Sequence, residues 1–136
     1  MLIEDDALVR NTLADTLAEE GIEVDGLANA EDALILLGSG QVPDVLVADI
    51  DLGAGLSGLD LASIARERHP EVEVILISGT APRPREHIAP NRERFLEKPF
   101  APSTLADTIR AAAASAKPKG GADGQDARNP SAWRAR

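Results

Sequence analysis

Carboxylate, hydroxyl and ammonium side chains follow four short apolar runs in this chain of 136 residues. In chain order these groups are Glu4-Asp5-Asp6, Asp49 with Asp51, Ser78, and Lys98. Each apolar run is typical of a buried strand, which places each polar group where a strand leaves its sheet. Because the carboxyl ends of parallel strands meet at one edge of a sheet, we expect all four groups to gather there.

Such a set of side chains can support phosphoryl transfer. Aspartate is an established nucleophile for phosphoryl groups. Clustered carboxylates raise each other's pKa, a cost that a hard divalent cation with oxygen ligands relieves, and Mg²⁺ is the natural candidate. A hydroxyl and an ammonium group can then neutralise charge on the oxygens of the transferred group. We therefore expect Asp49 to accept a phosphoryl group, with Ser78 and Lys98 beside it.

Each residue also has a plainer interpretation when it is taken alone. A carboxylate at the end of a strand is often only solvated, and acidic residues at the start of a helix favour its dipole, a role that fits Asp6. Ser78 before a glycine is common turn chemistry, and a lone lysine is usually a solvated surface charge. Their joint occurrence at four successive strand ends favours one shared site.

The hydrophobic pattern predicts alternating strands and helices. Strands are expected at residues 1–3, 22–27, 44–49, 72–77 and 95–97, and helices at residues 7–20, 30–38, 59–68 and 102–116. On the first helix Val9, Leu13 and Leu17 recur at every fourth residue and predict a buried stripe. Asn29 is expected to cap the second helix. The alternation predicts an α/β fold in which helices cover both faces of a parallel sheet.

Two segments depart from this alternation. Between residues 79 and 94 a long helix is excluded by three prolines, Pro82, Pro84 and Pro90. We expect at most a turn or two of helix there. The C-terminal segment is rich in Gly, Pro, Lys, Ala and Asp and has no periodicity. We therefore expect one domain over residues 1–116, followed by a disordered tail or linker over residues 117–136.

Composition and charge exclude several classes of function. The chain has no cysteine, which excludes disulfides and thiolate chemistry, and its two histidines are too few to favour a zinc site. Residues 1–116 carry 21 acidic and 9 basic side chains, so nucleic acid and anionic lipid are disfavoured as partners, whereas cations and basic protein surfaces are favoured. No apolar run approaches the roughly 20 residues that span a bilayer, and we expect no secretory signal sequence. We expect a cytoplasmic protein without membrane contact.

Four stretches together resemble the motifs of response-regulator receiver domains of two-component signalling. The resemblance covers about residues 1–116 and is carried by Ile3-Glu4-Asp5-Asp6, Val47-Ala48-Asp49, Leu76-Ile77-Ser78-Gly79 and Phe95-Leu96-Glu97-Lys98-Pro99-Phe100. It implies a flavodoxin-like, doubly wound, five-stranded parallel sheet with strand order 2-1-3-4-5. It further implies a binding module that catalyses only its own phosphorylation and dephosphorylation.

The resemblance implies a phosphoacceptor and a metal site. Asp49 would receive its phosphoryl group from a histidine kinase or a histidine phosphotransfer protein, and this would switch contacts with a downstream protein target. Mg²⁺ would be bound by the side chains of Asp5 and Asp49, by Glu4 through water, and by the backbone carbonyl of Asp51.

The resemblance also implies the residues that respond to phosphorylation. Ser78 would donate a hydrogen bond to the phosphoryl group, and Lys98 would pair with it. Ser78 and Phe95 would act as the switch residues, Phe95 by changing its rotamer. The peptide bond between Lys98 and Pro99 would be cis.

Several features depart from the family pattern. Gly53 stands where the family commonly has proline, and the loop before Gly58 is one residue longer. The first strand starts unusually close to Met1. The proline-rich segment at residues 81–91 replaces what is usually a regular fourth helix, so we expect that helix to be short or irregular. Since the family signals largely through this region, we expect a small output shift or an unusual partner.

Three alternatives remain open at this point. Asp49-Ile50-Asp51 also matches the nucleophile motif of haloacid-dehalogenase-type phosphatases. In that family, however, the acidic metal-binding cluster follows the lysine, whereas here residues 4–6 precede it, and no cap domain is inserted to select a substrate. A degenerate receiver would bind partners without phosphate. The chain is also compatible with a stand-alone receiver or with a piece of a hybrid kinase.

Overall fold

The computed structural model describes residues 1–79 and 93–116. The expected irregular helix at residues 81–91 and the expected tail at residues 117–136 lie outside these described residues. Within them the elements follow one another in the order β1 Leu2–Ile3, α1 Ala7–Glu19, β2 Gly26–Leu27, α2 Ala30–Gly38, β3 Val45–Asp49, α3 Gly58–Arg68, β4 Glu73–Ser78, β5 Glu93–Glu97 and α4 Pro102–Ala116.

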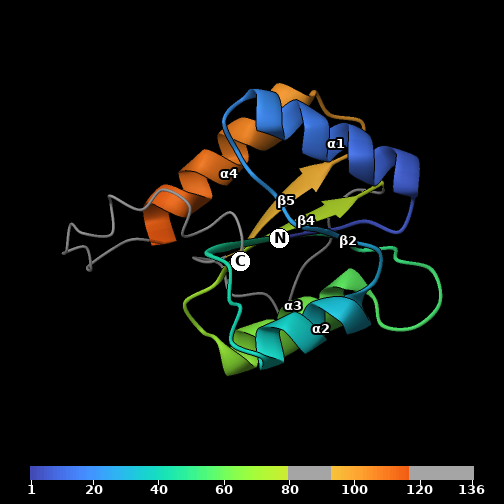
Figure 1. Cartoon of the computed structure of the whole chain (residues 1–136), viewed down its shortest axis with the longest axis vertical. Helices are drawn as coiled ribbons and strands as arrows, with labels where there is room; N and C mark the ends of the chain where they lie inside the picture. Colours follow the sequence, from blue (N-terminus) through green and yellow to red (C-terminus); the bar gives the residue numbers. More distant parts are fainter. Residues whose placement is uncertain (80–92, 117–136) are drawn as a thin grey trace.

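The five strands form one parallel sheet in the order β2-β1-β3-β4-β5. Helices α1 and α4 cover one face of the sheet, and α2 and α3 cover the other (Figure 1). This doubly wound α/β arrangement confirms the predicted fold and strand order. It follows that the residues after β1, β3, β4 and β5 all lie along the same edge of the sheet.

An aliphatic core lies on each face of the sheet, and the central strands are buried on both sides. Along β3, Leu46 and Ala48 belong to the cluster beneath α2 and α3, whereas Val45 and Val47 belong to the cluster beneath α1 and α4. This alternation follows the two-residue period of a strand. Asp49 is the last residue of this fully buried strand, so the sheet fixes its backbone rigidly.

Three helices begin at polar side chains that cap them. Asp6 Oδ1 accepts hydrogen bonds from the backbone of Leu8 and Val9 at the start of α1. Asn29 Oδ1 accepts from Asp32 N at the start of α2, which confirms the predicted cap. Ser57 opens α3 with a capping box. Each cap satisfies free N–H groups of the first turn and so sets where the preceding loop ends.

Three predictions about the elements need correction. Val9 does not join the buried stripe of Leu13 and Leu17, because it lies in the first turn of α1 before the helix packs on the sheet; 38% of Val9 is exposed. The second strand is only Gly26–Leu27, since β1 offers only two residues to pair with it. The last strand starts earlier than predicted, at Glu93, because ion pairs accommodate its first two charged residues.

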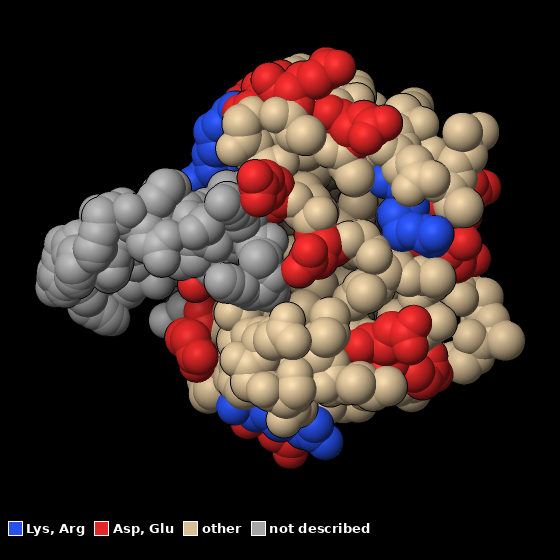
Figure 2. Space-filling model, viewed as in Figure 1, with Lys and Arg blue, Asp and Glu red and all other residues tan. Residues whose placement is uncertain are grey.

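The surface of the described residues is predominantly acidic. Asp and Glu side chains form several separate groups on the face shown in Figure 2, and Lys and Arg side chains are fewer. Residues 1–79 and 93–116 contain 20 acidic and 6 basic side chains. Five of the basic side chains donate hydrogen bonds inside the domain, namely Arg10, Arg66, Arg94, Lys98 and Arg110. Most of this positive charge is therefore already paired with the domain's own acceptors. No helix within residues 1–79 or 93–116 has the length and apolarity needed to cross a membrane.

Candidate functional site

Asp49 and Lys98 form a direct ion pair at the carboxyl edge of the sheet. Lys98 Nζ donates to Asp49 Oδ2 at 2.6 Å, and Asp51 N donates to Asp49 Oδ1 at 2.9 Å. Asp49 is 3% exposed, whereas the Lys98 side chain is 40% exposed. The carboxylate is thus held by one donor on each oxygen, and its ammonium partner reaches it from the solvent side.

The pairing of β4 with β5 carries Lys98 to this position. Ser78 ends β4 and lies opposite Glu97, the last residue of β5. Lys98 N then donates to Ser78 O at 2.8 Å, so the backbone stays paired one residue beyond the strand. Ser78 is buried, and the following Lys98–Pro99 peptide bond is cis, as the resemblance implies.

The acidic residues after β1 reach the same edge. Glu4 is 4% exposed, and its Oε2 accepts a hydrogen bond from Asp6 N at 3.0 Å. Arg10 donates to the backbone oxygen of Glu4 at 2.8 Å and fixes the turn between β1 and α1. Asp5 is exposed, next to the loop that follows β3. Glu4 therefore points into the domain, and Asp5 lies at its rim.

Burial and neighbouring charge alter the protonation of this site. Burial raises the pKa of Glu4 from 4.5 to about 7. The hydrogen bond from the Asp6 backbone opposes this rise, whereas the charge of Asp49 and the side-chain hydrogen bonds with Asp5 and Asp49 add to it. The hydrogen bond from Lys98 to Asp49 raises the pKa of Lys98, and burial opposes this shift. The negative charges of Asp49, Glu4 and Asp5 also raise the pKa of Lys98. The carboxylates at this edge thus carry more negative charge than one lysine neutralises.

This excess of negative charge fits a divalent cation. Within residues 1–79 and 93–116 no three or more His, Asp or Glu side chains form a group that could hold a metal ion by themselves. Mg²⁺ does not require such a group, because it usually keeps several waters and binds through one or two carboxylates. Asp49 and Asp5 supply that number of carboxylates at this edge. Burial is the main cause of the raised pKa of Glu4, and the charge of Asp49, which a cation would offset, adds to it.

Phe95 and Asp51, the other predicted site residues, are placed differently. Phe95 is half-buried in the middle of β5 and packs against the core on the side of α2 and α3. Asp51 is exposed, and its described contact with Asp49 runs through its backbone N–H. The structure thus joins Glu4, Asp49 and Lys98 through hydrogen bonds and electrostatic coupling, whereas Phe95 lies below them on its strand.

Gly58 is a site residue whose role the sequence did not reveal. A Cβ atom at this position would lie 2.3 Å from Asp49 O and 2.9 Å from Ile50 Cα. Gly58 N also donates to Ile50 O at 3.0 Å. Helix α3 therefore begins in direct contact with the backbone of Asp49, which only glycine permits. A glycine that opens a helix directly after the serine that caps it was the available signal.

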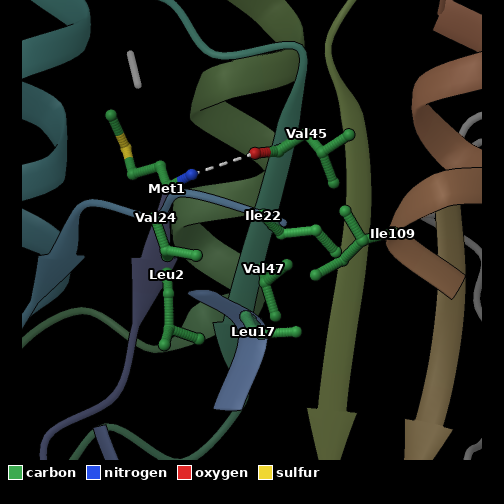
Figure 3. A pocket seen from close by; sticks show the side chains of 8 residues that line it. All are labelled: Met1, Leu2, Leu17, Ile22, Val24, Val45, Val47 and Ile109. Atoms are coloured by element: carbon green, nitrogen blue, oxygen red, sulfur yellow. Dashed lines mark hydrogen bonds between the residues drawn. The ribbon is translucent and has the colours of Figure 1, made fainter. Parts of the chain in front are cut away.

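A small pocket lies near the start of β1 and β3, away from the carboxyl edge. Eight apolar side chains line this small pocket of the described residues, among them Met1, Val45 and Ile109 (Figure 3). The N-terminal amine of Met1 donates to Val45 O at 3.3 Å beside it. The pocket presents no polar side chain that could orient a ligand or take part in chemistry. The carboxyl edge therefore remains the candidate functional site.

Comparison with known proteins agrees with this geometry. The family model of the response regulator receiver domain matches residues 1–110, which is most of the chain. The chain belongs to the response regulator receiver domain family. It is accordingly a receiver domain of two-component response regulators, and the alternative of a haloacid-dehalogenase-type phosphatase finds no support.

Several relatives and solved structures illustrate the likeness. The response regulator protein FleR of Pseudomonas aeruginosa is 30% identical over 132 residues, which cover 96% of this chain and 28% of FleR. The nitrogen assimilation regulatory protein NtrX of Azorhizobium caulinodans is 32% identical over 74% of this chain and 22% of NtrX. A crystal structure of a response regulator receiver protein from Sinorhizobium medicae superposes with a TM-score of 0.74 at 27% identity, over 85% of this chain and 93% of that one. The chain thus spans under a third of these two curated relatives but nearly all of this receiver structure.

Proposed function

We propose that this receiver domain is switched by phosphorylation of Asp49. The observation that carries the proposal is the ion pair between Asp49 and Lys98, in which a buried carboxylate at the end of a rigid strand meets an ammonium group at 2.6 Å. One carboxylate oxygen of Asp49 attacks the phosphorus of a phosphohistidine on a kinase or phosphotransfer protein. The P–N bond breaks, and the leaving imidazole nitrogen takes a proton from solvent. The product is an acyl phosphate on Asp49.

The residues around Asp49 support this reaction by position and charge. Lys98 can follow the negative charge from the carboxylate to the new phosphoryl group, since its long side chain is partly exposed and reaches Asp49 from the solvent side. The proposed donors for Mg²⁺ are the side chains of Asp5 and Asp49, the backbone carbonyl of Asp51 and, through water, Glu4. The cation would supply a Lewis acid that neutralises phosphoryl oxygens.

The proposed output is contact with another protein in the cytoplasm. The acidic surface of the described residues favours a basic protein partner over nucleic acid or an anionic membrane. Ser78 and Phe95 are the proposed switch residues, because one ends β4 beside the site and the other lies on the edge strand that carries Lys98. The domain is proposed to turn over no substrate other than its own phosphoryl group.

Labelling with a small phosphodonor tests the acceptor. Acetyl phosphate and Mg²⁺ should add one phosphoryl group to the wild type by intact mass, and none to Asp49→Asn. Asp51→Asn is the matched control and should still be labelled, because its proposed contribution runs through its backbone. Equal labelling of the wild type and Asp49→Asn would place the acceptor elsewhere. Multiple turnovers of p-nitrophenyl phosphate would instead indicate a phosphatase.

A further inference from the structure

One side chain outside the site ties the loop between β3 and α3 to helix α2. Glu31 lies in the first turn of α2, and its Oε2 accepts a hydrogen bond from Leu56 N at 3.1 Å. Leu56 directly precedes Ser57, the residue that caps α3. The hydrogen bond therefore fixes the far end of the loop that begins just after Asp49.

Two glycines bring the backbone of this loop close to two carboxylates. Gly53 and Gly55 have φ angles of 75° and 90°, which glycine adopts at little cost. A Cβ atom at Gly55 would lie 2.7 Å from Glu31 Oε2, and one at Gly53 would lie 3.5 Å from Asp5 Oδ2. The loop thus runs between Asp5 at the rim of the site and Glu31 on α2, and a side chain at Gly55 would displace the Glu31 carboxylate.

We propose that Glu31 is a positioning residue that sets the affinity of the site for a divalent cation by tethering this loop. The inference rests on the proposed function, in which the Asp51 carbonyl at the start of the loop is a metal ligand. Asp51 N donates to Asp49 Oδ1 at the start of the loop, and the bond at Leu56 holds its far end, so the loop that carries this carbonyl is ordered before the cation arrives. Without the tether, the loop must be ordered when the cation binds, and the cost of ordering it weakens binding.

The test compares Mg²⁺ affinity in matched variants of the full chain, measured by isothermal titration calorimetry. Glu31→Ala removes the acceptor for Leu56 N, and we expect it to weaken Mg²⁺ binding about three- to tenfold, as the usual net worth of one hydrogen bond implies. Asp32→Ala removes the same charge from the neighbouring position but breaks no described bond to the loop, and should change the affinity less than about twofold. Glu31→Gln keeps an oxygen acceptor and should behave like Asp32→Ala.

A metal-free measurement checks the tether itself. In EDTA, hydrogen exchange at the Leu56 amide should be faster in Glu31→Ala than in the wild type or Asp32→Ala, with similar melting temperatures in all three. Equal Mg²⁺ affinities of Glu31→Ala and Asp32→Ala, or unchanged exchange at Leu56, would overturn this inference while leaving the proposed function intact. If the wild type itself failed to bind Mg²⁺, the metal site of the proposed function would fall, and the inference with it.

Discussion

Replacing Glu4 by glutamine should stabilise the metal-free protein, and increasingly so as the pH rises. Glu4 is 4% exposed, and its pKa is raised from 4.5 to about 7 by burial and by the neighbouring Asp49. Between these two pH values the folded protein retains a proton that the unfolded chain releases. Since the folded state binds more protons there, the free energy of unfolding falls as the pH rises.

The size of the effect follows from the shift of the pKa. Between pH 4.5 and about 7, each pH unit lowers the free energy of unfolding by about 1.4 kcal/mol. The ionised Glu4 therefore destabilises the fold by at most about 3 kcal/mol above pH 7. Glutamine cannot ionise, yet its amide oxygen can still accept the hydrogen bond from Asp6 N that Glu4 accepts at 3.0 Å. Glu4→Gln should thus match the wild type near pH 4.5 and exceed it by about 1 to 3 kcal/mol at pH 8.

Urea denaturation of both proteins in EDTA at pH 5, 6, 7 and 8 measures this difference. The gap between the two free energies of unfolding should widen up to about pH 7 and then level off. The same series in saturating Mg²⁺ is the control, and there the gap should shrink, because a bound cation stabilises the ionised carboxylates. A gap that is constant or narrows with rising pH would refute the account of Glu4.

Three further substitutions test other parts of the site and fold. Lys98→Met should lower the free energy of unfolding by about 1 to 2 kcal/mol in urea at pH 7.5, because the buried Asp49 loses a charge-assisted hydrogen bond; an unchanged value would mean that the ion pair contributes nothing. Gly58→Ala should cost about 1 to 3 kcal/mol, since its Cβ would lie 2.3 Å from Asp49 O. Gly38→Ala is its control, with no atom within 4 Å of the added Cβ, and should be neutral or stabilising by thermal melting. Asn29→Ala should cost about 1 kcal/mol by the same assay, because helix α2 loses its cap, and no loss would show that the cap is dispensable.

The order of elements and the edge where the polar residues meet followed from the sequence, because both depend on local patterns. Apolar runs and helix caps depend on residues close together in the sequence. A parallel sheet then brings the carboxyl ends of its strands to one edge. Lys98 was expected to lie beside Asp49 for this reason, although the two residues are 49 apart; the direct ion pair between them comes from the structure.

What the sequence could not predict depends on contacts between distant residues. Residues 22–27 alternate as a strand should, yet only Gly26–Leu27 pairs, because β1 provides two partners. The last strand was predicted only from residue 95, but β5 begins at Glu93, which pairs with Arg66 of α3 at 2.6 Å. The close approach of Gly58 to Asp49 likewise exists only once α3 is docked.

The most direct test of the central claim is to locate the phosphoryl group chemically. After labelling with acetyl phosphate and Mg²⁺, borohydride reduces an aspartyl phosphate to homoserine, and peptide mass spectrometry then identifies the altered residue. Phosphorylation of Asp49 should yield homoserine at this residue and at no other aspartate. Homoserine at Asp5 or Asp51 with Asp49 unchanged would contradict it.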